Sequence, residues 1–119
     1  MTIKVKKLYE DAILPTKGSQ YAAGYDLYAY IPEGKVIIAP HSTVKIGSGV
    51  AIEPPEQTFG AVFARSGLAT KQGLRPANCV GVCDEDYRGE YIVALHNDTN
   101  EERVIENGER IAQVAFIPY

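Results

Sequence analysis

Residues 90–107, EYIVALHNDTNEERVIEN, determine the fold class, because they form one of only two stretches longer than a dozen residues that contain neither glycine nor proline; the other is 1–14. Glycine and proline break long helices. Within 90–107 the polar run Asn97–Asn100 interrupts the apolar segment that ends at Leu95. This pattern predicts two strands joined by a turn, that is, a hairpin. Helical bundles and coiled coils are therefore excluded.

Short segments typical of strands recur along the rest of the chain. They show either alternation of apolar and polar residues or a brief apolar run, at Ile3–Lys6, Val36–Ile38, Val44–Gly47 and Ala61–Phe63. Turn-forming residues such as proline, glycine and asparagine separate them. Many short strands at roughly ten-residue spacing indicate an all-β sandwich, distorted β-barrel or jelly roll.

The last predicted strand, Arg110–Ile117, carries apolar side chains on both faces. Such a strand is normally covered on both sides. In a domain of this size we expect another subunit to supply one of the covers. Gln113 lies on this strand and needs a hydrogen-bond partner, either a ligand or the backbone.

One segment departs from the β pattern. Residues 66–73 begin with Ser66 as a possible N-cap and end at Gly73, which predicts a helix of one or two turns. Arg65 precedes it, and a helix N-terminus beside an arginine is suited to binding phosphate. The plainer alternative is a capped turn with a surface arginine.

The composition indicates one ordinary globular domain. The chain has 119 residues, 45% of them hydrophobic, and a formal net charge of −3. There is neither an apolar run long enough for a membrane helix nor a signal peptide, so we expect a soluble, cytoplasmic protein without a membrane partner. The acidic balance argues against a nucleic-acid polymer as partner.

The two cysteines, Cys79 and Cys83, predict neither a disulfide nor a metal site. In one extended strand they would lie about 13 Å apart, which is beyond disulfide reach. A zinc site with His96 would lack both the usual spacing and a fourth ligand.

Two acidic positions are candidates for chemistry. Asp84, Glu85 and Asp86 are consecutive, and they suit either a general base or an acidic turn closed by Gly89. Asp26 lies among apolar and aromatic neighbours, where a carboxylate must be paired, hydrogen-bonded or close to a metal. A structural salt bridge would explain Asp26 equally well.

Four segments taken together, in this order, resemble the trimeric deoxyuridine triphosphate nucleotidohydrolases (dUTPases). They are Ala23–Leu27, Arg65–Ala69, Gly81–Gly89 and Gly108–Gln113. The resemblance implies a jelly-roll subunit in a homotrimer, with active sites between subunits. It also implies hydrolysis of dUTP to dUMP and pyrophosphate with Mg²⁺ as cofactor.

The resemblance further implies a role for each matching residue. Asp84 would position or deprotonate the attacking water and hold the 3′-hydroxyl, and Tyr87 would lie against the deoxyribose and exclude a 2′-hydroxyl. Asp26 would hold Mg²⁺ through water. A hairpin over 78–83 would read uracil, through Asn78, Gly81, Val82 and Cys83. The phosphates would contact Arg65, Ser66, Gly67 and Gln113.

This sequence departs from the family pattern in two respects. Three positions carry unusual residues: Ala64 where proline is common, Gln72 where histidine is common, and Cys83 where an aliphatic residue is usual. We interpret residues 1–119 as a single dUTPase-like domain without the C-terminal glycine-rich arm, and we expect such a chain to bind dUTP but to turn it over slowly. The alternatives are an enzyme related to dCTP deaminase and a non-catalytic nucleotide-binding regulator.

Overall fold

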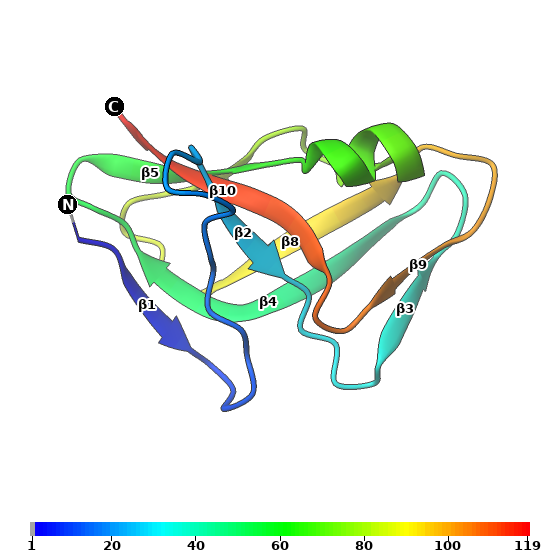
Figure 1. Cartoon of the computed structure of the whole chain (residues 1–119), viewed down its shortest axis with the longest axis horizontal. Helices are drawn as coiled ribbons and strands as arrows, with labels where there is room; N and C mark the ends of the chain where they lie inside the picture. Colours follow the sequence, from blue (N-terminus) through cyan, green and yellow to red (C-terminus); the bar gives the residue numbers. More distant parts are fainter. Residues whose placement is uncertain (1) are drawn as a thin grey trace.

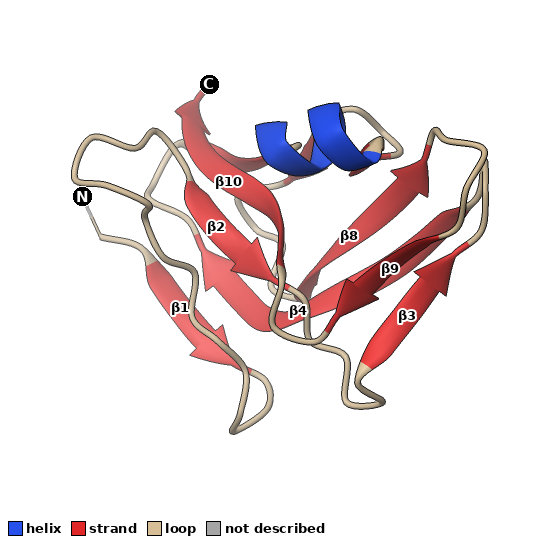
Figure 2. Ribbon diagram, turned by 45° about the vertical axis from the view of Figure 1, so that its right-hand side comes forward, coloured by secondary structure: helices blue, strands red, loops and turns tan. Residues whose placement is uncertain are grey.

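The computed structural model describes residues 2–119 and confirms the predicted all-β class (Figures 1 and 2). One four-stranded sheet has the order β1 (Lys4–Lys7), β4 (Thr43–Glu53), β8 (Glu90–Asn97) and β6 (Leu74–Pro76). The second has the order β2 (Tyr25–Tyr28), β10 (Arg110–Pro118), β5 (Thr58–Phe63) and β7 (Gly81–Cys83). A two-stranded ribbon joins β3 (Lys35–Ile38) to β9 (Arg103–Glu106). All the pairings described are antiparallel.

The core is formed by alternate residues of these strands. In β8, Tyr91, Val93 and Leu95 are buried, whereas Ile92 between them is 52% exposed. This is the two-residue period of a strand with one face toward a core. The buried cluster also contains Leu27, Ile46, Val50, Ile52, Ile105, Ile111 and Val114.

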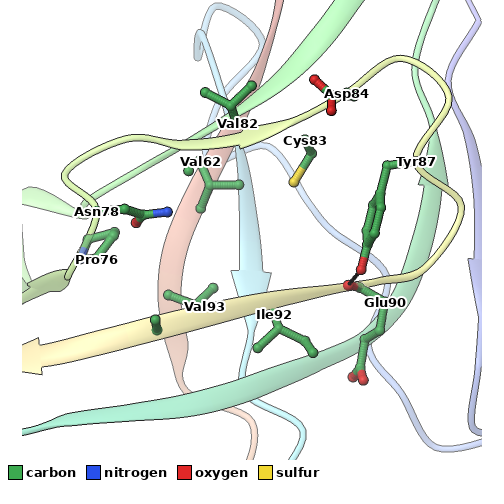
Figure 3. Close-up of a pocket in the computed structure, with 12 residues that line it drawn as sticks. Val62, Pro76, Asn78, Val82, Cys83, Asp84, Tyr87, Glu90, Ile92 and Val93 are labelled. Atoms are coloured by element: carbon green, nitrogen blue, oxygen red, sulfur yellow. Dashed lines mark hydrogen bonds between the residues drawn. The ribbon is translucent and has the colours of Figure 1, made fainter.

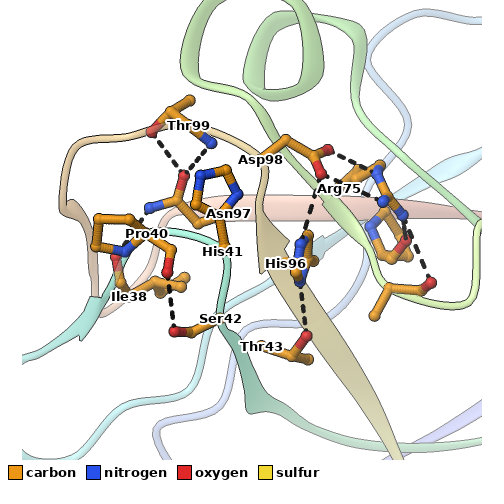
Figure 4. Close-up of polar contacts among 12 residues, drawn as sticks. Ile38, Pro40, His41, Ser42, Thr43, Arg75, His96, Asn97, Asp98 and Thr99 are labelled. Atoms are coloured by element: carbon orange, nitrogen blue, oxygen red, sulfur yellow. Dashed lines mark hydrogen bonds and ion pairs between the residues drawn. The ribbon is translucent and has the colours of Figure 1, made fainter.

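The predicted hairpin over 90–107 is wrong in its pairing, although both strands and the turn between them exist. β8 pairs with β4 and β6, whereas β9 pairs with β3. The reason is Asn97, whose buried amide donates to the carbonyl oxygen of Ile38 at 3.0 Å (Figure 4). It also donates to the carbonyl oxygen of Glu101 at 2.8 Å. The bond to Ile38 attaches the turn to the end of β3, so the chain leaves the first sheet after β8.

The last strand, β10, is covered on both sides only near its start. Ile111, Ala112 and Val114 are buried, but Ala115 is half-buried and Ile117 is 36% exposed. A single chain therefore does not cover both faces of β10 along its whole length.

The short helix η1 (Leu68–Gln72) is present, but its predicted serine cap is wrong. Gly67, directly before η1, has a helical φ of −61°, and no side-chain hydrogen bond caps the helix. Ser66 already belongs to the first turn, because the Ala69 amide donates to the Arg65 carbonyl (2.9 Å). Gly73 ends the helix in the left-handed conformation as predicted (φ 66°). Among residues 2–119, no helix has the length and apolarity needed to cross a bilayer.

Candidate active site

A pocket of about 240 Å³ lies between β7 and β8 (Figure 3). We call it the β7 pocket. Six of the predicted site residues line it: Asn78, Gly81, Val82, Cys83, Asp84 and Tyr87. Its other walls come mainly from β8, from β5 and from the end of β6. The structure thus brings together every residue predicted to contact uracil, the sugar or the attacking water.

The pairing of β7 with β5 positions the predicted general base. Cys83 lies opposite Gly60, and Asp84 follows directly after the strand. Because successive side chains alternate, the Cys83 sulfur points toward β8 and the Asp84 carboxylate points away from it (Figure 3). Asp84 is exposed at the edge of the pocket. A carboxylate in this position can accept a hydrogen bond from a water molecule.

The hairpin predicted over 78–83 is wrong as a description of the backbone. β6 belongs to the first sheet and β7 to the second, so the strands on either side of this turn do not pair with each other. The turn instead takes the chain from one sheet to the other. It is tight: the Cys79 amide donates to the Pro76 carbonyl (3.0 Å), and Cys79 itself has a positive φ of 64°.

Tyr87 is held in one orientation at the other end of the pocket. Its hydroxyl donates to the Glu90 carbonyl oxygen at 2.8 Å. Gly89 makes this possible, since a Cβ there would lie 2.6 Å from the Tyr87 hydroxyl oxygen. The ring is 42% exposed and is therefore available to a ligand.

Among the three consecutive carboxylates, Glu85 is held by hydrogen bonds from distant segments. The Glu85 carboxylate accepts hydrogen bonds from the Gln57 amide and the Tyr119 hydroxyl, both at 2.7 Å. These bonds, that from Tyr119 first, lower the pKa of Glu85 below its ordinary value. Glu85 therefore ties the loop to two other segments, while Asp84 lines the pocket.

A second pocket, of about 230 Å³, collects most of the residues predicted to contact phosphate. We call it the Arg65 pocket. It is lined by Gly18, Ala22, Gly24, Asp26, Arg65, Ser66 and Gln113. Gly67, the remaining predicted phosphate residue, is exposed and directly follows Ser66.

The strand pairing explains why the residues of the Arg65 pocket meet. Gln113 in β10 lies opposite Asp26 in β2 and Phe63 in β5. The Gln113 amide nitrogen donates to the Ala64 carbonyl (3.0 Å), which supplies the partner that this residue needs. A Cβ at Gly24 would lie 3.1 Å from the Gln113 side-chain oxygen, so a glycine there leaves room for the amide.

The Asp26 carboxylate faces two arginines. Its oxygens lie 3.3 Å from Arg65 Nε and 3.7 Å from Arg110 Nη1. This pairing satisfies the largely buried carboxylate, as the salt-bridge alternative expected. In residues 2–119, three or more histidine, cysteine or acidic side chains do not gather in a way that could hold a metal. The protein therefore offers one carboxylate to a cation in this pocket.

The two pockets share no lining residue. One holds the predicted base and sugar contacts, and the other holds the predicted phosphate and metal contacts. A single chain thus presents two halves of the predicted site rather than one complete site.

Sequence reasoning missed two residues beside the β7 pocket. Glu90 lines the pocket and accepts a hydrogen bond from the Gly49 amide (2.8 Å), which fixes a bulge in β4. The sequence feature that could have identified Glu90 is a carboxylate at the start of an apolar strand. Tyr91 lies behind the pocket and was interpreted only as part of that strand. Burial raises the pKa of the Tyr91 hydroxyl and of the nearby Cys83 thiol, so both groups are neutral near pH 7.

Comparison with known proteins gives a consistent result. A family model described as dUTPase matches residues 10–119. The chain is 49% identical over 122 residues to a deoxyuridine 5′-triphosphate nucleotidohydrolase of Desulfitobacterium hafniense (strain DSM 10664 / DCB-2), covering 98% of this chain and 80% of that protein. It is 46% identical over 118 residues to the enzyme of the same name from Aquifex aeolicus, covering 98% of this chain and 78% of that protein.

Solved structures agree with these matches. A mutant dUTPase of Staphylococcus bacteriophage 80alpha, solved with dUpNHpp, has a TM-score of 0.88 at 26% identity, covering 99% of this chain and 83% of that one. A mutant dUTPase from phage phi11 of S. aureus, whose structure concerns the coordination of a structural Mg(II) ion, has a TM-score of 0.88 at 23% identity, covering 100% and 92%. The family model and the two relatives show that this chain belongs to the dUTPase family.

Proposed function

We propose that this protein hydrolyses dUTP to dUMP and pyrophosphate, with Asp84 positioning the attacking water. The observation that carries the proposal is the joint placement of Asp84 and Tyr87 on one pocket between β7 and β8. Uracil would contact the backbone around Gly81 and the Asn78 side chain, and the deoxyribose would lie against Tyr87. The ring would leave no room for a ribose 2′-hydroxyl, which favours deoxynucleotides.

Asp84 would accept a proton from water, or orient that water, for attack on the α-phosphorus. It would also hold the 3′-hydroxyl. Reactions of this kind depend mainly on positioning and on stabilisation of charge, and need no covalent intermediate with the protein. Arg65, Ser66, Gly67 and Gln113 would donate hydrogen bonds to the triphosphate.

The Arg65 pocket suits Mg²⁺ held through water rather than directly. Asp26 is the carboxylate that lines it, and two arginines already face that carboxylate. Mg²⁺ commonly keeps several waters and joins one carboxylate to phosphate oxygens, and it would neutralise charge on the triphosphate. Asp26 would therefore orient the waters of the ion.

We further propose a homotrimer in which each active site lies between subunits. The support is the division of the predicted residues into two pockets without a common residue. The β7 pocket of one subunit would face the Arg65 pocket of another. The cytoplasmic location expected from the sequence stays a prediction.

The deciding experiment measures pyrophosphate released from dUTP with Mg²⁺, beside ammonia released from dCTP. We expect pyrophosphate from dUTP and no ammonia from dCTP. Asp84→Asn should lower kcat by about 10²- to 10⁴-fold with the fold retained, because the side chain is exposed. Ammonia release would favour the deaminase alternative, and dUTP binding without hydrolysis would favour the regulator.

A further inference from the structure

Tyr91 has a side chain whose position hydrogen bonding does not explain. It is 1% exposed in β8. Its hydroxyl oxygen is buried and has no hydrogen bond of good geometry among residues 2–119, although the neighbouring Cys83 thiol contributes to its raised pKa. A buried hydroxyl without a well-formed hydrogen bond costs free energy. We therefore look for the contribution of Tyr91 in the contacts of its ring.

The ring occupies a space bounded by the second sheet and by Tyr87. A Cβ at Gly60 would lie 2.6 Å from the Tyr91 hydroxyl oxygen, so the phenol reaches the backbone of β5 only because residue 60 is glycine. Gly60 is paired with Cys83, the residue before Asp84. The rings of Tyr91 and Tyr87 lie with their centroids 6.1 Å apart and their planes at 43°.

The buried ring of Tyr91 therefore supports the exposed ring of Tyr87. Tyr87 lines the β7 pocket and Tyr91 does not. The hydroxyl of Tyr87 is fixed by the Glu90 carbonyl, but that single bond leaves the ring free to tilt about its end. Contact with the rigid ring of Tyr91 removes this freedom.

We propose that Tyr91 is a positioning residue that sets the selection of dUTP over UTP by fixing the ring of Tyr87. This inference rests on the proposed function, since it assigns the sugar contact to Tyr87. A tilted Tyr87 ring would open space for a 2′-hydroxyl. Loss of Tyr91 should therefore improve the relative use of UTP rather than only lower activity.

The first test replaces the ring with a smaller apolar side chain. In Tyr91→Leu we expect the ratio of kcat/KM for dUTP to that for UTP to fall at least fivefold. Ile105→Ala is the matched control, because Ile105 is fully buried in β9, away from both pockets. It should lower the melting temperature and leave the ratio unchanged. An unchanged ratio in Tyr91→Leu would overturn the inference.

The second test does not depend on Tyr91→Leu folding. Gly60→Ala places a methyl group against the Tyr91 hydroxyl and should displace the ring. Removal of that hydroxyl in the double variant Gly60→Ala/Tyr91→Phe relieves the shortest contact and leaves the nearest ring carbon at 3.2 Å. We expect the dUTP to UTP ratio to fall in the single variant and to recover in the double variant. Equal ratios in the two variants contradict a role for Tyr91.

A structural readout separates failure of this inference from failure of the proposed function. If the unaltered protein does not hydrolyse dUTP, the proposed function fails. Crystal structures of the unaltered protein and of Gly60→Ala still test the support of Tyr87. A displaced Tyr87 ring shows that Tyr91 supports Tyr87 whatever the activity, and an unmoved ring overturns the inference.

Discussion

At the scale of single residues, the buried amide of Asn97 fixes the path of the chain after β8. Its nitrogen donates to two carbonyl oxygens, and its oxygen accepts from the Thr99 amide (2.9 Å) and hydroxyl (2.7 Å). All of its hydrogen-bonding capacity is thus used inside the protein. A buried carbonyl group without a donor costs free energy. The bond from Asn97 to the Ile38 carbonyl therefore ties the turn after β8 to β3.

Asn97→Ala should therefore lower the free energy of unfolding by about 2–4 kcal/mol, because it leaves buried carbonyl groups without donors. Urea unfolding followed by circular dichroism measures this. Asn100→Ala is the control, since Asn100 is exposed and accepts only from His41 among the bonds described. It should change stability by less than about 0.5 kcal/mol. Equal losses in both variants would contradict the assignment.

Glu85 should make stability depend on acid pH. Its pKa is lowered from the ordinary 4.5 in the folded protein, mainly by the Tyr119 hydroxyl and the Gln57 amide. A lowered folded pKa means that the stabilisation is complete above the unfolded pKa and is lost as the pH falls through the folded pKa. We expect Glu85→Gln to melt at a lower temperature than the unaltered protein at pH 7. The difference should shrink as the pH falls below the ordinary pKa of 4.5, whereas exposed Glu56→Gln should show little difference at any of these pH values.

The predicted site residues come from short segments that each have a recognisable pattern, and their roles come from the resemblance to the family. Sequence reasoning missed the structural use of Glu85, because Gln57 and Tyr119 are distant in the sequence. It also misplaced Ser66. A serine before helix-forming residues favours a cap, but the turn begins one residue earlier, so Ser66 lines the Arg65 pocket instead.

At the level of elements, alternation predicted the strands well and their partners poorly. Period two reports which residues face a core, and this property is local. The choice of partner depends on distant groups, such as the Ile38 carbonyl that accepts from Asn97. For this reason β8 and β9 were predicted correctly as strands and wrongly as a pair.

The bulge in β4 should be sensitive at Gly49. This residue has a φ of 74°, and a Cβ would lie 2.9 Å from the Cβ of Ala12. Gly49→Ala should cost about 1–3 kcal/mol through backbone strain and overpacking. Gly18→Ala is the comparison, because a Cβ there meets no atom within 4 Å and φ is not positive. Thermal unfolding of both variants measures the difference, and equal melting temperatures would contradict the role of the bulge.

Considered as a whole, the molecule divides the predicted site residues other than Gly67 between two pockets. The sequence could place residues on strands, but how a second copy meets the first depends on surfaces that no local pattern describes. The resemblance supplied the homotrimer as an expectation, and the separate pockets support it as a proposal.

Mixed assemblies test this proposal. Asp84→Asn disables the β7 pocket, and Arg65→Gln disables the Arg65 pocket. If each site takes one pocket from each of two subunits, a random equal mixture of these inactive chains restores about one quarter of the sites. Activity after co-refolding, compared with each variant refolded alone, measures the recovery. No recovery, with trimers formed, would mean that a site uses a single chain.

The two thiols differ in access, and this has a practical consequence. Cys79 is exposed on the turn that forms one end of the β7 pocket, whereas Cys83 is half-buried with a raised pKa. The chain has two cysteines in all and no tryptophan. A thiol-reactive fluorophore would therefore attach to Cys79 in preference to Cys83, against a background free of indole emission. The natural sequence thus carries the attachment point for an optical nucleotide sensor without any engineered cysteine.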